Sequence, residues 1–483
     1  MLKKNKWIYF LLFLVVLFSF VFRVYFSNST YNDDEAYFHL RHIKNIVENK
    51  EVLHYDPLSF GGRVVIYPPL FHLIMAFLSF GNLFLLKYLP ELFFALSIIL
   101  FYFVGKELCK RDYVVLFCCL LYSFTPDFLG LTMNVLSVFS LVIPLFLLIV
   151  FCLFRLKEHR FLYIFLVSSF LFPLLHHSAM LFVVAALIFL LMNISEDLQL
   201  ERIEIETLFF SILSVIFINL VLYRDLFLEY GLDLLANFGL IEGAFLFDRG
   251  IGSFLFYLGI LVLFLGSFGF YIGILKKKHV VVYFLGAVFL SVLFLFIINL
   301  LSFEDSLIYL ILCLCLVSCV GLDSLFNYFE NFRWKYTVPF LVLTLCLLFV
   351  GLSFYPAVRL VEEIKPVALE KIEDFIWLRD YSNEGDVVLS LIDDGHLISY
   401  FSERKNVVDN NLLGAKDAQE RLDDIRIIYK GWYFAKAKEY IKGYNIKWIY
   451  MPKDLLVYGI SDLSYVSRTD CLVRRGNFYE VVC

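Results

Sequence analysis

The chain has 483 residues, of which 61% are hydrophobic and 18% are charged, and its mean hydropathy is +0.80. A soluble domain normally carries about a quarter charged residues, so these values exclude an ordinary soluble protein. The net charge of −5 includes no basic excess, and no nucleic-acid partner is expected.

Long apolar runs with short polar breaks extend from Trp7 to Pro356, and the pattern then stops. A hydrocarbon core about 30 Å thick requires about 20 apolar residues per helix. From about Glu362 onward, charged residues recur every few positions. The sequence therefore predicts a polytopic α-helical membrane domain over residues 1–360, followed by a small soluble domain over residues 361–483.

The membrane domain is expected to contain about eleven spans. We interpret the first apolar run, which follows three lysines, as a retained span and not as a cleaved signal peptide. The apolar segment 67–80 is short for a span, so we expect an interfacial or re-entrant helix there. The predicted spans cover residues 7–26, 83–105, 113–126, 135–154, 161–175, 178–192, 206–223, 251–275, 279–300, 306–326 and 336–356.

The basic residues predict the orientation, because cytoplasmic loops collect Lys and Arg. With these spans, every basic cluster falls on the same side as the N-terminus. These clusters are Lys3–Lys6, Lys106–Arg111, Arg155–Arg160, Lys276–Lys278 and Arg333–Lys335. We therefore expect a multi-pass protein of the cell membrane with a cytoplasmic N-terminus. The first loop and the soluble domain then both lie on the extracellular face.

The first outer loop carries the segment Asp33–Arg41, which begins with three consecutive carboxylates. Such residues repel one another unless a cation or a proton offsets their charge. They suit binding of a hard divalent cation such as Mg²⁺ or Mn²⁺, or removal of a proton from an acceptor. The alternative is a solvated helix start, with Asp at the cap and Glu in the first turn of a helix over 35–49.

Other polar residues are expected on the same outer face. His176 and His177 lie at the turn of a short hairpin, where a solvated turn is the alternative to a ligand set. Glu242 lies in an apolar stretch, where an unpaired carboxylate is costly. The pairs Asp248–Arg249 and Glu304–Asp305 complete this set.

The soluble domain is predicted to have an α/β fold, because apolar strands alternate with helical segments. Helices are expected over Ile372–Asp380 and 417–442. Strands are expected over 386–391, 405–409, Lys447–Met451 and Phe478–Val482. Cys471 and Cys483 could form a disulfide if this domain faces an oxidising space.

The order of these motifs resembles the GT-C superfamily of membrane glycosyltransferases, especially the catalytic subunits of archaeal oligosaccharyltransferases. The resemblance is strong at both ends of the chain and rests on topology in the middle. The segments that carry it are Asp33–Arg41, Tyr55–Ser59, Tyr67–His72, Trp377–Asp380, Val387–Ile398 and Tyr400–Asn410.

The resemblance implies inverting transfer of a sugar or glycan from a polyprenyl-phosphate-linked donor to a protein or glycan acceptor on the outer face. It implies that Asp34, Glu35 and Glu242 are the catalytic carboxylates, and that Asp34 and Glu35 would bind a divalent cation. Candidate contacts to the donor phosphate are Arg41, Arg249, His176 and His177. Candidate contacts to the acceptor are Asp393, Asp394 and His396.

Three departures from the family pattern keep alternatives open. Leu391–Gly395 lacks the family's aromatic pair, the second acidic motif is reduced to Asp127, and Phe303–Asp305 stands where an arginine is expected. The alternatives are an oligosaccharyltransferase that acts on Asn sequons and a degenerate scaffold that binds lipid without turnover. A transporter is disfavoured, because the carboxylates gather at one surface and no internal repeat is evident.

Overall fold

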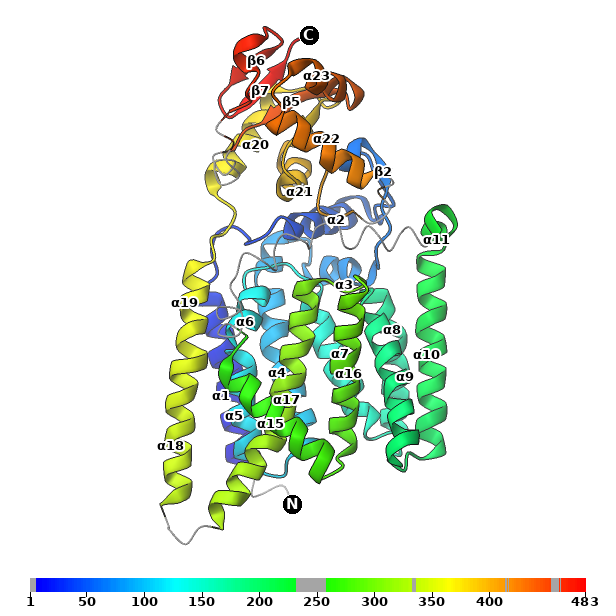
Figure 1. The fold of residues 1–483 in the computed structure, drawn as a ribbon, viewed down its shortest axis with the longest axis vertical. Helices are drawn as coiled ribbons and strands as arrows, with labels where there is room; N and C mark the ends of the chain where they lie inside the picture. The colour runs from blue at the N-terminus through cyan, green and yellow to red at the C-terminus, as the bar shows by residue number, and fades with distance from the viewer. Residues whose placement is uncertain are drawn as a thin grey trace.

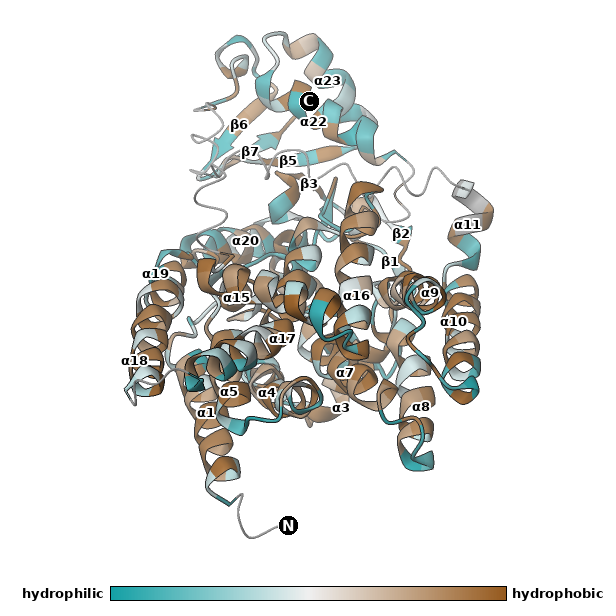
Figure 2. Cartoon of the chain, turned by 60° about the horizontal axis from the view of Figure 1, so that its bottom comes forward, coloured by the Kyte–Doolittle hydropathy of each residue, from teal (hydrophilic) through white to brown (hydrophobic). Residues whose placement is uncertain are grey.

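The computed structural model describes residues 6–231, 258–331, 336–412, 415, 417–452, 460 and 462–483. A bundle of long helices forms one end of the molecule, and a small domain with a β-sheet forms the other (Figure 1). The hydropathy of the two parts differs as expected, with mainly apolar helices in the bundle and many hydrophilic segments in the sheet domain (Figure 2).

Within the described residues, seven helical segments are long and apolar enough to cross a membrane, or eight if one bent pair counts as a span. In the bent pair, α5 (Asp112–Ser123) and α6 (Pro126–Thr132) meet at 56°. Pro126 begins α6 because proline lacks the N–H needed to continue the preceding helix. The seven are α1 (Lys6–Tyr25), α4 (Leu89–Leu108), α9 (Ala179–Glu196), α10 (Arg202–Leu222), α16 (Val280–Ile297), α17 (Phe303–Glu330) and the continuous segment Thr337–Glu363.

Three further apolar segments are shorter than a usual span. They are α7 (Phe139–Leu153), α8 (His159–Leu175) and Ile260–Lys276, which begins with α15 (Ile260–Phe270). Within the described residues, each of the eleven predicted spans overlaps a helix, although fewer have full spanning length, and the first seven residues of the predicted span 251–275 lie outside the described part. The chain is a multi-pass membrane protein, and its number of spans is approximate.

The last membrane helix continues toward the sheet domain. It consists of α18 (Thr337–Phe349), a π-helical turn (Val350–Phe354) and α19 (Tyr355–Glu363). Predicted span 336–356 therefore ends before the helix does. At the centre of the bundle, 89% of the apolar window of α17 is buried, so α17 is surrounded by other helices.

Ion pairs connect the predicted basic clusters at the end of the bundle that lies away from the sheet domain (Figure 1). The Arg111 guanidinium lies 2.6 Å from the Asp323 carboxylate, and Lys277 Nζ lies 3.5 Å from the same side chain. Arg155 contacts Glu107 at 2.5 Å. Arg111, Arg155 and Lys277 therefore lie at the same end of the bundle, whereas Arg333–Lys335 lies outside the described residues. The assignment of that end to the cytoplasm stays a prediction of the positive-inside rule.

The sheet domain has five strands in the order β4-β3-β5-β7-β6. Strand β3 pairs in parallel with β4 and β5, whereas β7 pairs antiparallel with β5 and β6. The strands are β3 (Val387–Leu389), β4 (Lys405–Asn406), β5 (Ile446–Tyr450), β6 (Leu472–Arg475) and β7 (Phe478–Val481). Cys471 and Cys483 form a disulfide, as the sequence suggested.

The helices of this domain partly differ from the prediction. Helix α20 (Leu369–Tyr381) includes the expected segment, but the expected helix 417–442 is two helices, α22 (Ala418–Lys430) and α23 (Phe434–Gly443). Gly431 follows α22 in an extended conformation, and glycine is a poor helix former. Strand β6 was not predicted.

The first outer loop lies between the bundle and the sheet domain (Figure 1). It contains α2 (Glu35–Asn49), which has the predicted bounds, the short strands β1 (Tyr55–Asp56) and β2 (Arg63–Val64), and α3 (Leu70–Leu78). The nine-residue α3 is as short as predicted for segment 67–80, and its interfacial or re-entrant position stays a prediction.

Hydrogen bonds fix the sheet domain onto this loop. Phe60 N–H donates to Asn406 Oδ1 at 2.8 Å, and Ser59 Oγ donates to Asp409 Oδ2 at 2.7 Å. The Arg63 guanidinium lies 3.1 Å from the buried Asp409 carboxylate. The first loop and the sheet domain thus form one continuous surface above the bundle.

Candidate active site

The three consecutive carboxylates at the start of α2 have three different environments. Asp33 is partly buried, and its Oδ1 accepts a hydrogen bond from Ala36 N–H at 3.0 Å, which caps the helix. Asp34 is buried and faces the sheet domain. The Glu35 side chain is 68% exposed, with Oε1 3.6 Å from His39 Nε2. Only part of the predicted acidic cluster is therefore open to a substrate.

The pKa values of the two more accessible carboxyls move in opposite directions. Desolvation, and then the negative charge of Glu35, raise the pKa of Asp33 to about 7. Desolvation acts in the same sense on Glu35, but the proximity of His39 outweighs it and lowers the pKa of Glu35. Asp33 can therefore exchange a proton near neutral pH, while Glu35 stays ionised.

Asp34 connects the first loop to the sheet domain. Its Oδ1 accepts a hydrogen bond from Leu397 N–H at 2.8 Å, and its Oδ2 accepts one from His396 N–H at 3.3 Å. Burial, and then the charge of Asp394, raise the pKa of Asp34 well above its ordinary value. These contacts describe a positioning residue, and direct participation of Asp34 in catalysis or metal binding stays a prediction.

A cluster of histidines lies behind the carboxylates. His39 Nδ1 and His72 Nε2 are 2.9 Å apart, and His42 Nδ1 lies 2.7 Å from Tyr67 Oη. Burial and the neighbouring positive charges lower the pKa of both His42 and His72 well below the usual range, so both are neutral. No site role was predicted for these histidines from the sequence, although His39 and His42 are three residues apart on one face of α2.

His176 and His177 lie in the turn between α8 and α9, next to the start of α17. Their ring nitrogens and a carboxylate oxygen of Asp305 lie within 4.8 Å of one another, and no other group in the described ranges has such metal-binding geometry. His177 Nε2 is 3.9 Å from Asp305 Oδ2. Glu35 acts electrostatically on His177, which places this turn beside the start of α2.

The predicted acceptor contacts are mostly buried. Asp394 is 1% exposed and lies 2.8 Å from Lys371 Nζ, whereas Asp393 is exposed. His396 is buried, with Nδ1 3.9 Å from Asp409 Oδ2 and its ring centroid 5.1 Å from that of Phe38. Their acceptor role stays a prediction, and Asp393 is the member that can meet an external ligand.

Of the two arginines predicted to contact the donor phosphate, one is paired with a carboxylate and the other lies outside the described residues. Arg41 is paired with the Asp56 carboxylate through two hydrogen bonds of 2.8 and 2.5 Å. Arg41 also lowers the pKa of Asp56, although desolvation opposes this shift. Arg249 lies outside the described residues, as does the predicted catalytic Glu242.

A buried polar network, which the sequence did not indicate, supports the end of the bundle next to the sheet domain. Arg23 contacts Glu91 at 3.0 Å and donates to Thr132 Oγ1 at 2.8 Å. Asn134 N–H donates to Glu91 Oε1 at 2.6 Å. This network holds the segment after α6, the place where the family pattern predicts a second acidic motif. Asp127 is buried in the first turn of α6.

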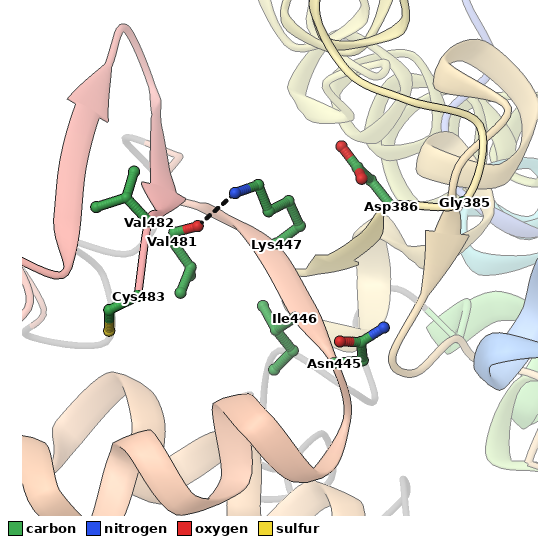
Figure 3. A pocket seen from close by; sticks show the side chains of 8 residues that line it. All are labelled: Gly385, Asp386, Asn445, Ile446, Lys447, Val481, Val482 and Cys483. Atoms are coloured by element: carbon green, nitrogen blue, oxygen red, sulfur yellow. Dashed lines mark hydrogen bonds between the residues drawn. The ribbon is translucent and has the colours of Figure 1, made fainter.

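A separate pocket lies in the sheet domain, at the ends of β3, β5 and β7 (Figure 3). Lys447 lies on β5, and its Nζ donates a hydrogen bond to Val481 O at the end of β7 at 2.7 Å (Figure 3). The residues that line this pocket belong to segments 385–386, 445–447 and 481–483, so it is distinct from the site at α2.

Comparison with known proteins identifies the fold. No family model and no curated protein matches the chain. The oligosaccharyltransferase AglB from Archaeoglobus fulgidus, in complex with an inhibitory peptide and a dolichol-phosphate, aligns with a TM-score of 0.75 at 13% identity. This alignment covers 94% of this chain and 70% of AglB.

Two further structures agree. AglB in complex with Zn and sulfate aligns with a TM-score of 0.68 at 13% identity, covering 91% of this chain and 68% of AglB. ArnT from Cupriavidus metallidurans, bound to undecaprenyl phosphate, aligns with a TM-score of 0.53 at 11% identity over 99% of this chain and 98% of ArnT. The chain therefore has the fold of the GT-C glycosyltransferases, as the sequence motifs predicted.

Proposed function

We propose that this protein is an inverting glycosyltransferase that moves a sugar from a polyprenyl-phosphate-linked donor to an acceptor on the outer membrane face. The observation that carries the proposal is the convergence of Asp33, Glu35, His177 and Asp305 beneath the sheet domain. The structural similarity to AglB and ArnT, which were solved with dolichol-phosphate and undecaprenyl phosphate, supports this class of donor.

The proposed reaction is a displacement at the anomeric carbon of the donor sugar. The acceptor forms the new bond, the bond between sugar and phosphate breaks, and the acceptor proton passes to a carboxylate. Asp33 suits this last role because its pKa of about 7 is matched to proton transfer near neutral pH. The exposed Glu35 orients the acceptor beside Asp33, and Glu242 is proposed to complete the set of carboxylates.

The divalent cation was predicted to bind Asp34 and Glu35, but the contacts of Asp34 favour other ligands. Both Asp34 carboxyl oxygens already accept backbone hydrogen bonds, which leaves them poorly suited to a hard cation. Glu35 is open to an ion, but it is a single carboxylate. We therefore propose that cation binding does not depend on Asp34.

The experiment measures the transfer of label from extracted polyprenyl-linked sugars by the purified protein in detergent. Glu35→Gln is expected to lower the transfer rate by about 100-fold, because misplacement of a substrate by about 1 Å can cost about 10²-fold. The matched control is Glu48→Gln, an exposed glutamate at the far end of the same helix. Equal rates in Glu35→Gln and the unmodified protein would contradict the proposal.

Oligosaccharyl transfer to Asn sequons is the second candidate. It is favoured by the higher structural similarity to AglB than to ArnT. It is weakened at Leu391–Gly395, which lacks an aromatic pair and in which Asp394 is buried against Lys371. Label transfer to a sequon peptide, lost when the peptide Asn is replaced by Gln, would support this candidate over other acceptors.

A further inference from the structure

The side chains of His176, His177 and Asp305 together have the composition of a transition-metal site. They offer two imidazole nitrogens and one carboxylate oxygen, all within 4.8 Å of one another. Catalytic zinc sites commonly use three such protein ligands and leave a fourth position for water or substrate. Mg²⁺ prefers oxygen ligands, so the two nitrogens favour zinc over magnesium.

The ring of His176 is held by neighbouring groups in the way expected of a metal ligand. His176 Nδ1 is 2.8 Å from Ser178 Oγ, and that hydroxyl is 2.7 Å from Tyr309 Oη. Ser178 and Tyr309 are both buried, and the His176 ring packs against Phe139 with 5.1 Å between centroids. Ser178 N–H also approaches His176 Nδ1, at 3.3 Å. Because metal-binding histidines generally donate their second ring N–H, binding of an ion by Nε2 requires Nδ1 to carry the proton and donate it to Ser178 Oγ.

The position of the three residues connects them to the start of α2. Glu35 acts electrostatically on His177, and His39 acts on His176. Asp305 lies in the first turn of α17, where Ser302 Oγ accepts a hydrogen bond from Asp305 N–H at 3.0 Å and fixes the turn. An ion held here would lie at the outer end of the bundle, beside the exposed carboxylates.

We propose that His176, His177 and Asp305 bind one Zn²⁺ ion, whose open coordination position receives a phosphate oxygen of the lipid-linked donor. The proposed ion is therefore Zn²⁺ in place of the expected Mg²⁺ or Mn²⁺. Its ligands are His176, His177 and Asp305 in place of Asp34 and Glu35. The zinc site is inferred from the three side chains alone. The phosphate as fourth ligand rests on the proposed function. The ion would offset the charge that develops on the departing phosphate.

The first test measures the zinc content of the purified full-length protein by mass spectrometry after chelation and dialysis against Zn²⁺. We expect about one ion per chain. His177→Ala and Asp305→Ala should lose this ion, and the matched control His54→Ala should keep it, since His54 is an exposed histidine of the first loop. Absence of zinc from the unmodified protein, or equal zinc in all variants, would overturn the proposal.

A second test needs no variant and so does not depend on variant folding. Co²⁺ replaces Zn²⁺ in such sites, and its d–d absorption reports nitrogen and oxygen ligands in a four-coordinate geometry. We expect this absorption in the Co²⁺-loaded protein and its change when undecaprenyl phosphate is added. A spectrum identical to that of aqueous Co²⁺ would overturn the site. An unchanged spectrum on lipid addition would overturn the phosphate as fourth ligand.

These outcomes separate the metal site from the proposed function. Zinc binding without sugar transfer in any assay would leave the site standing and remove the glycosyltransferase proposal. Sugar transfer at an unchanged rate in protein shown to contain no zinc would support the glycosyltransferase proposal and overturn the metal site.

Discussion

At the scale of single residues, the chemistry depends on how differently the chain places Asp33, Asp34 and Glu35. Glu35 is exposed, Asp34 is buried under the sheet domain, and Asp33 is partly buried at the helix cap. Neighbouring positions at a helix start point in different directions, so three adjacent carboxylates do not act as one cluster. Each therefore has its own testable consequence.

The first prediction concerns the pH dependence of transfer through Asp33. The proton-accepting form is the ionised carboxylate, so the rate should rise as the pH increases through about 7, the pKa of Asp33. Asp33→Asn should remove this rise and lower the rate by at least about 100-fold. Steady-state rates from pH 5 to 9, with Glu48→Gln as control, provide the measurement. An unchanged pH profile in Asp33→Asn would refute the role.

The same shift has a consequence for stability with a defined sign. The pKa of Asp33 is raised from 3.8 to about 7 in the folded protein. The contribution of Asp33 to the free energy of unfolding is therefore fully present below about pH 4, and it is lost as the pH rises through about 7. Asp33→Asn should leave the melting temperature unchanged near pH 4 and raise it, relative to the unmodified protein, at pH 8.

The second residue-scale prediction concerns Asp34. Asp34→Ala leaves the N–H groups of His396 and Leu397 without their acceptor, which costs about 1–3 kcal/mol for a buried donor. Limited proteolysis should then cleave faster between α19 and α20, where the chain enters the sheet domain. Asp34→Asn, which keeps one acceptor oxygen, should have a smaller effect. Equal proteolysis in all three proteins would show that Asp34 does not hold the domain.

At the scale of elements, the contact between α15 and α17 depends on glycine. A Cβ atom at Gly269 would lie 2.2 Å from Val317 O, and one at Gly321 would lie 2.6 Å from Leu265 O. The two helices can approach this closely only without side chains at these positions. The close contact helps to fix the start of α17, and therefore Asp305, relative to the rest of the bundle.

Gly269→Ala tests this contact directly. The added methyl group meets backbone atoms that cannot rotate away, so we expect a destabilisation of about 1–3 kcal/mol. Gly286→Ala on the neighbouring helix α16 is the matched control, because its nearest heavy atom would be 3.7 Å away. Thermal unfolding in detergent should show a lower melting temperature for Gly269→Ala alone. A similar loss in both variants would contradict the proposed close contact.

The elements also show what the sequence could and could not predict. Within the described residues, every helix long and apolar enough to cross a membrane overlaps a span predicted from hydropathy, because a run of apolar residues has one dominant solution in a bilayer. Asp at the cap followed by Glu in the first turn predicted the start of α2, where Asp34 is the N-cap residue. Strand β6 was missed because Leu472–Arg475 is short and half charged. The break at Gly431 was missed because the flanking segments are both amphipathic.

The site was less predictable than the fold, for a physical reason. Asp34, Glu35, His176 and His177 were predicted to share the outer face, which stays a prediction, and their partners are distant in sequence. Asp34 contacts residue 397, and His177 contacts Asp305. His39 and His72 meet across 33 positions. Only packing of the helices decides such contacts, and no local pattern encodes it.

At the scale of the whole molecule, the basic clusters and the candidate site lie at opposite ends of the bundle. The positive-inside rule then predicts that the site faces the exterior. A membrane-impermeant maleimide should label Trp432→Cys in the sheet domain of intact cells, because Trp432 is exposed. Lys157→Cys, exposed at the basic end, should react only after permeabilisation. The reverse pattern would invert the topology.

If the protein consumes a lipid-linked sugar, the lipids and glycans of cells that lack the gene should change. Mass spectrometry should compare lipid-linked sugars and surface glycans in a deletion strain complemented with the unmodified gene, Glu48→Gln or Glu35→Gln. We expect the deletion strain to accumulate a polyprenyl-phosphate-linked sugar and to lose a surface glycan. The unmodified gene and Glu48→Gln should restore both, and Glu35→Gln should restore neither. Unchanged lipids and glycans in the deletion strain, or full restoration by Glu35→Gln, would contradict the proposed function.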